Sequence, residues 1–120
     1  MKKKKKKPHL PALTPWEEEK ALRIRDRYRY SLSAIGASMD YHVYDITERF
    51  LSFAKPGKER NYIVRCKRYF DSLGYNQRRC FLAEVLEKGR VYPFWFTSEF
   101  TDGEYLRLRK EVLCQATRIL

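Results

Sequence analysis

The sequence predicts a small, mostly α-helical (all-α) domain of five to six helices behind a disordered basic N-terminal tail. Three observations indicate this fold class. The Thr-x-x-Glu pattern of a helix capping box occurs twice, beginning at Thr14 and at Thr101. Apolar residues recur at spacings of three and four through most of the chain after Thr14. Six consecutive lysines, Lys2 to Lys7, repel one another and cannot pack against a core, so we expect disorder there.

One helical domain is expected at 14–120, preceded by a polylysine tail and linker at 1–13. A chain of 120 residues is long enough to bury one hydrophobic core. Its hydrophobic content of 43%, with 15% aromatic residues, argues against disorder of the whole chain. The prolines of the linker, Pro8 and Pro11, favour extended backbone.

The first helix is expected at about 15–30. Thr14 can cap it, and Pro15 suits the first helical position because the N–H that proline lacks would be unpaired there. Glu17 completes the capping box. The arginine-rich run at 22–30 alternates apolar and charged residues, which would also suit a half-buried strand. The helix is preferred because the cap and the EEEKAL start both favour it.

Glycine and proline mark the ends of the later helices. Pro56-Gly57 separates two of them, and Gly74 and Gly89 each follow another. The aromatic segment at 91–96 is broken by Pro93, so it is predicted to be short and extended. Helices are expected at about 15–30, 33–39, 43–54, 59–72 and 76–88, with a last helix that begins near Thr101.

The segment from 33 to 54 resembles a general helix-turn-helix pattern. Gly36 is the small residue that lets two helices cross closely, and Asp40 tolerates the left-handed backbone of the turn. Ile46 and Phe50 are the apolar anchors of the second helix. The resemblance implies that this second helix enters the major groove of DNA. An ordinary corner between two helices gives similar patterns and remains the alternative.

The residues that would face the major groove are unusual for a DNA reader. They include an acid and no arginine, although arginine and lysine are the commonest readers of guanine. Arg49 also stands where the second helix usually carries an apolar residue. The candidate residues of this segment are His42, Tyr44, Thr47, Glu48 and Arg49.

Charge indicates the class of partner. The chain has 26 Lys and Arg against 15 Asp and Glu, a formal net charge of +11, which attracts polyanions such as nucleic acid. Charged residues that merely coat solvent-facing helices are the alternative for any single position. Further basic residues cluster at Arg60, Arg65, Lys67, Arg68, Arg78 and Arg79. The candidate phosphate-binding residues are Lys2, Lys3, Lys4, Lys5, Lys6, Lys7, Arg23, Arg25, Arg27 and Arg29.

Aromatic residues lie beside these cations, as in Tyr28-Arg29-Tyr30. Exposed rings next to cations can stack on the bases of single strands or RNA loops. For the aromatic segment at 91–96 we favour packing in the core or in a dimer contact, because exposing several consecutive large rings promotes aggregation.

Catalysis has little support in the sequence. His9 and His42 have no nucleophile at a motif spacing, and the five glycines are too scattered for a phosphate-binding loop. Cys66, Cys80 and Cys114 lack the CxxC spacing of a zinc site, and their odd number and wide spacing suggest a reducing compartment without disulfides. We expect neither an enzyme nor a metal ion or cofactor.

The sequence therefore predicts a nucleic-acid-binding protein: a small DNA-binding regulator or accessory factor that favours duplex DNA over RNA. Its last helix could support a homodimer. The alternatives are a protein-interaction module (an adaptor or inhibitor with a basic aromatic surface) and an RNA-binding accessory protein. No apolar stretch approaches the ~18 residues that span a bilayer, so no membrane partner is expected. The expected location is the cytoplasm, in association with the nucleoid. In a eukaryote the expected location is the nucleus.

Overall fold

A computed structural model describes residues 13–37, 41–92 and 94–120, and over these ranges the chain is mostly helical and contains no strand. The predicted mostly helical fold class is confirmed. Of the predicted polylysine tail and linker at 1–13, residues 1–12 lie outside the described residues. The helices are α1 (Pro15–Ala34), the 3₁₀ turn η1 (Val43–Asp45), α2 (Glu48–Phe53), α3 (Lys58–Ser72), α4 (Tyr75–Phe81), the π-helical turn η2 (Leu82–Leu86) and α5 (Asp102–Ile119).

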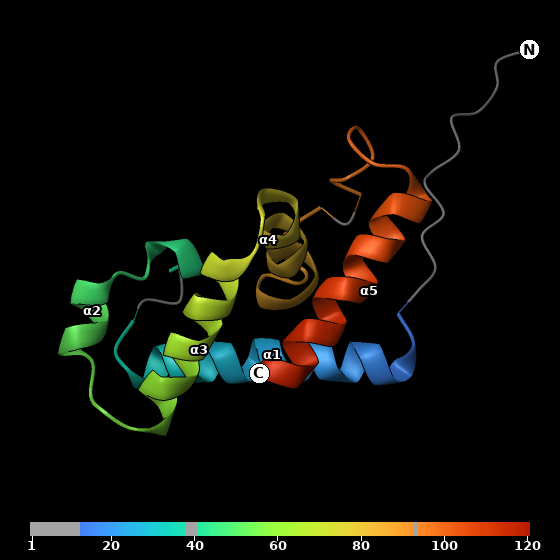
Figure 1. The fold of residues 1–120 in the computed structure, drawn as a ribbon. Helices are drawn as coiled ribbons and strands as arrows, with labels where there is room; N and C mark the ends of the chain where they lie inside the picture. The colour runs from blue at the N-terminus through green and yellow to red at the C-terminus, as the bar shows by residue number, and fades with distance from the viewer. Residues whose placement is uncertain (1–12, 38–40, 93) are drawn as a thin grey trace, which may run out of the picture.

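The longest helix, α1, is the base of the fold. It contacts α3, η2 and α5, and Figure 1 shows α3 and α5 descending onto it with α4 between them. The hydroxyl of Tyr69 in α3 donates a hydrogen bond to the carbonyl oxygen of Val112 in α5 at 3.0 Å. The buried side chains of these helices form one continuous hydrophobic cluster. The loops and short helices are arranged around this cluster.

The start of α1 is the one that the sequence predicts. Thr14 Oγ1 accepts a hydrogen bond from the Glu17 backbone N–H at 3.2 Å, and Glu17 Oε1 accepts one from the Thr14 N–H at 3.1 Å. Pro15 occupies the first helical position. The same reciprocal pair at Thr101 and Glu104 opens α5.

The separate helices predicted at 15–30 and 33–39 are wrong, because α1 continues through Ala34. Gly36, with φ +84°, then ends the helix. The Gly36 N–H donates to the carbonyl oxygen of Ser33 at 3.1 Å, and the Ala37 N–H to that of Leu32 at 2.9 Å. This is a Schellman motif, in which glycine takes the left-handed position. Gly36 is therefore a helix terminator and not the small residue of a helix crossing.

The single helix predicted at 43–54 is also wrong. Ile46 and Thr47 have extended backbone between η1 and α2, with ψ values of 119° and 161°. Thr47 Oγ1 accepts a hydrogen bond from the Phe50 N–H at 3.0 Å, so a new helix starts there. The six-residue α2 is only about 9 Å long at 1.5 Å per residue. The helix-turn-helix at 33–54 is thus not confirmed; Met39 and Asp40 of its turn lie outside the described residues.

The extended segment predicted at 91–96 is not confirmed, because the described part of it forms successive turns. The Trp95 N–H donates to the Tyr92 carbonyl oxygen at 3.1 Å, and the Phe100 N–H to that of Phe96 at 2.9 Å. Phe96 is fully buried and stacks on Tyr105, with ring centroids 3.8 Å apart. Its ring therefore belongs to the core. Pro93 lies outside the described residues.

Replacing Phe96 by alanine tests this packing. We expect Phe96→Ala to lower the free energy of unfolding by about 3–5 kcal/mol, because it removes a fully buried ring stacked on Tyr105. Phe94→Ala is the matched control and should cost clearly less, since Phe94 is only partly buried. Urea unfolding followed by circular dichroism measures both. Equal losses would contradict the different burial of the two rings.

The buried cysteines make stability depend on pH. Burial raises the pKa of both the Cys66 and the Cys80 thiol to about 12. The unfolded chain loses these protons near pH 8.5 and the folded protein does not, so the contribution to stability is present below that pH and is lost as pH rises toward 12. The third cysteine, Cys114, is exposed.

We therefore expect wild-type protein to lose stability between about pH 8 and about pH 10, with about 2 kcal/mol of the loss due to each buried thiol. Cys66→Ala should show a correspondingly shallower decline. The measurement is the urea midpoint at the two pH values, with Cys114→Ala as the matched control. Identical pH dependence of Cys66→Ala and wild type would show that the Cys66 thiol stays protonated on unfolding or ionises in the fold.

Candidate nucleic-acid interface

The arginines of α1 do not form one surface. Successive helical residues are rotated by about 100°, so the period-two alternation of arginines places them on both sides of the buried residues Ile24 and Tyr28. Arg27 faces α3, where it lines a hollow together with residues of that helix. Arg23 is exposed and lies 3.8 Å from the Glu19 carboxylate. The candidates of α1 are therefore divided between two flanks.

The other flank of α1 faces the segment after η2. Arg25 pairs with Asp26 at 3.0 Å, and its Nη1 lies 3.5 Å from the carbonyl oxygen of Lys88. Burial, and after it the charges of Arg90 and Arg25, lower the pKa of the Arg29 guanidinium. Arg25 thus helps to hold the chain after η2 against α1. Arg29 lies on the same side, next to Glu87 and Arg90, and neither arginine lines the groove on the α3 side.

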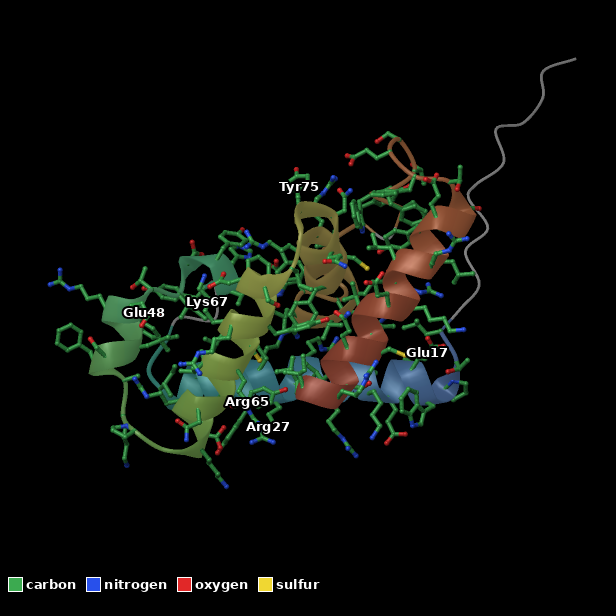
Figure 2. The ribbon with its side chains drawn as sticks, viewed as in Figure 1. Glu17, Arg27, Glu48, Arg65, Lys67 and Tyr75 are labelled. Carbon is green, nitrogen blue, oxygen red and sulfur yellow. The ribbon has the colours of Figure 1, made fainter. Side chains whose placement is uncertain are left out.

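A basic groove lies where α1 and α3 meet. It has a volume of about 460 Å³ and is open to solvent. The polar residues of α3 that line the groove are separated by three, four and three positions, so they lie on one face of the helix. Figure 2 shows the side chains of Arg27 and Arg65 close together at this crossing. The lining residues are Arg27, Lys58, Asn61, Val64, Arg65 and Arg68, and none of them is acidic.

One aromatic ring holds two of these cations. The guanidinium carbon of Arg27 lies 4.3 Å from the ring centroid of Tyr62, and that of Arg65 lies 5.4 Å from the same centroid. Tyr62 is fully buried, so the two arginines cover its ring. Cation–π contacts attract guanidinium groups but leave their charge uncompensated. Two like charges are therefore held near each other at the edge of the groove.

The basic residues next to the groove either form ion pairs or donate hydrogen bonds to backbone carbonyl oxygens. Lys67 pairs with Asp71 at 3.1 Å, and Arg60 Nε donates to the carbonyl oxygen of Leu51 at 2.8 Å. Arg78 donates to the carbonyl oxygens at the end of α3. By contrast, none of the described carboxylates forms an ion pair with the four groove cations. These cations are Arg27, Lys58, Arg65 and Arg68.

Arg79, another basic residue singled out in the sequence, is also occupied. Its guanidinium donates to both carboxylate oxygens of Glu99, at 2.5 and 2.9 Å, and lies 4.5 Å from the ring centroid of Trp95. The hydrogen bond to Glu99 raises the pKa of Arg79. Arg79 thus attaches the turns after η2 to α4, and the Trp95 ring is covered instead of offering a free stacking surface.

The helix-turn-helix candidates do not share one helix face. His42 Nδ1 lies 2.5 Å from a carboxylate oxygen of Glu87, and its ring stacks on Tyr44 with centroids 4.8 Å apart. These two residues belong to the loop and to η1, not to a recognition helix. The pair with Glu87 connects this loop to the end of η2.

The remaining helix-turn-helix candidates surround the start of α2. Thr47 is its N-cap, Glu48 its first residue, and the carbonyl oxygen of Arg49 accepts a hydrogen bond from the Ser52 hydroxyl at 2.6 Å. All three are exposed. The structure therefore brings His42 and Tyr44 together but separates both from the groove between α1 and α3.

Sequence reasoning missed the α3 half of the groove as a site. Arg65 and Arg68 were noted only as part of a general basic cluster, and Lys58 and Asn61 were not singled out. The signal available in the sequence was the 3-4-3 spacing of these four polar residues. Nothing in the sequence indicated that Arg27 would lie beside them, because that proximity depends on how α1 and α3 cross.

No protein-family model, curated protein or solved structure matches this chain. Across the described residues, no group of three or more His, Cys, Asp or Glu side chains is arranged to hold a metal ion. No helix in the described part of the chain is both long and apolar enough to cross a membrane. The groove is thus interpreted from its own charges and geometry.

Proposed function

We propose that this protein binds the phosphate backbone of nucleic acid in the basic groove between α1 and α3. The proposal depends on one observation: four cations gather around a hollow that no acidic residue of the described ranges lines. Charges held this way attract an anion, and a chain of phosphates supplies one anion after another. The role that follows is that of a nucleic-acid-binding accessory factor or regulator.

The side chains suit phosphate contacts. Arg65 and Arg27 present planar guanidinium groups, which bind phosphate oxygens with two parallel hydrogen bonds. Lys58 and Arg68 lie near opposite ends of α3, about 15 Å apart along its axis at 1.5 Å per residue. That length covers several successive phosphates, since one strand of a duplex advances about 3.4 Å per nucleotide. Asn61 adds a neutral hydrogen-bond donor between them.

The lysine run at the N-terminus supports the same function. Six adjacent positive charges attract any polyanion and raise the rate of encounter, without selecting a sequence. In this proposal the lysines Lys2 to Lys7 bring the nucleic acid close, and the groove holds its backbone. The short α2 offers no comparable support for reading base edges, so the binding proposed is to the backbone.

A protein-interaction module remains the second candidate. The side chain of Phe53 is 80% exposed, and α2 stands at one end of the molecule (Figure 1). Aromatic side chains, phenylalanine among them, are enriched in protein–protein interfaces. An acidic protein bound through Phe53 would depend on that ring, whereas a nucleic acid bound in the groove would not.

Neutralising the two arginines over Tyr62 tests the proposed function. The Arg27→Gln/Arg65→Gln double variant removes two phosphate contacts, so the slope of log K against log salt should fall by about 1.5. Fluorescence anisotropy with a labelled strand of about 20 nucleotides measures this slope. Lys110→Gln/Arg118→Gln removes the same charge from exposed positions on α5 and should leave the slope nearly unchanged.

Two further controls distinguish binding by the groove from binding by the lysine tail and from a loss of binding caused by misfolding. A full-length variant with glutamine at positions 2–7 should bind more weakly but keep its dependence on Arg27 and Arg65. Thermal melting checks that the groove variant still folds, because Arg27→Gln uncovers the Tyr62 ring. Equal losses in the groove and α5 variants would refute the groove and leave only a dependence on net charge.

A further inference from the structure

Two exposed aromatic rings lie on the outer face of α1, one on each side of the arginine that enters the groove. Trp16 is 56% exposed and Tyr30 is 65% exposed. With the cations between them they follow helical spacings of four, three, four and three, so they share one face of the helix. This outer stripe consists of Trp16, Lys20, Arg23, Arg27 and Tyr30.

The stripe has an aromatic ring at each end and three positive charges between the rings. Lys20 Nζ lies 5.8 Å from the ring centroid of Trp16, and Arg23 stands between Lys20 and Arg27 along the helix. Through Arg27 the stripe is continuous with the basic groove. From Trp16 to Tyr30 it extends about 21 Å at 1.5 Å per residue. Its composition resembles that of surfaces on which bases stack while their phosphates are neutralised.

We infer that the groove holds a single strand and that the bases of this strand stack on Trp16 and Tyr30. This inference rests on the proposed function. Single-stranded RNA and single-stranded DNA both offer the required chemistry, which is a phosphate chain with free base faces. In a duplex the base faces are stacked on one another, so these two rings would have nothing to stack on.

The shape of the groove favours a single strand for a second reason. A protein helix that reads duplex DNA must protrude into a groove about 12 Å wide. The basic face of α3 does not protrude: it forms one wall of a hollow whose other wall carries Arg27 of α1. A flexible strand can follow such a hollow and then cross the outer face of α1, whereas a stiff duplex with paired bases cannot.

Tryptophan fluorescence reports stacking directly. The chain has two tryptophans, so a full-length Trp95→Phe protein leaves Trp16 as the sole tryptophan. The probes are an RNA strand of about 20 nucleotides, the DNA strand of the same sequence, the corresponding duplex, and an abasic strand with equally many phosphates. We expect both single strands with bases to quench Trp16 strongly, and the duplex and abasic strand to quench it weakly.

Alanine variants separate stacking from charge in the otherwise wild-type chain. Trp16→Ala/Tyr30→Ala should weaken binding of the single strand fivefold or more, roughly the loss expected for a stacked base, and leave duplex affinity and the salt slope unchanged. Tyr75→Ala/Tyr92→Ala is the matched control, because these rings are 74% and 67% exposed but lie outside the stripe. Figure 2 shows Tyr75 on the side of the molecule opposite Arg27 and Arg65.

The outcomes distinguish this inference from the function on which it rests. If single strand, duplex and abasic strand bind equally well through Arg27 and Arg65 and Trp16 fluorescence does not change, the inference is wrong and the backbone-binding function stands. If no probe depends on Arg27 and Arg65, the proposed function itself is wrong. Quenching of Trp16 fluorescence by either single-stranded RNA or single-stranded DNA supports the inference. The strand that binds more tightly shows whether the protein prefers ribose or deoxyribose.

Discussion

The packing of Tyr62 at the crossing of α1 and α3 is the interaction on which the groove depends. The ring is fully buried, and Arg27 from α1 and Arg65 from α3 lie over it. Beside it, the Ser31 hydroxyl of α1 donates to the Glu59 carboxylate of α3 at 2.5 Å. These contacts fix how the two helices cross. Because the crossing is fixed, the position of α1 that carries Arg27 stays beside the basic face of α3.

The distribution of carboxylates explains why the groove keeps its charge. Glu59 accepts its hydrogen bond from Ser31, Asp71 pairs with Lys67, and Glu99 binds Arg79. Each of these acids is used to join or stabilise helices, and none lines the groove. The repulsion among the groove cations is tolerable because the hollow is open and screened by water and salt. A phosphate chain would relieve that repulsion, which is a physical reason for it to bind there.

The sequence predicted those features that short-range chemistry determines. The capping boxes at Thr14 and Thr101 require only residues three apart, and both were correct. Gly36 and Thr47 were misassigned because their roles depend on the backbone around them. A glycine can allow a close crossing or end a helix, and a threonine can lie inside a helix or cap one. The groove could not be predicted from local sequence, since the approach of Arg27 to Lys58 and Arg65 results from the tertiary packing of α1 against α3.

The arginine run of α1 shows how one sequence pattern serves two purposes. Its alternation has a period of two, and the helix has a period of 3.6 residues, so neighbouring arginines fall on opposite sides of the buried stripe. Arg25 and Arg29 face the end of η2 and the segment after it, where Arg25 contacts the carbonyl oxygen of Lys88, whereas Arg27 lines the groove. A strand with the same sequence would place all the arginines on one face. The helical conformation thus confines the basic surface on this side of α1 to a narrow stripe, which connects the exposed rings of Trp16 and Tyr30 to the cations of α3 through Arg27.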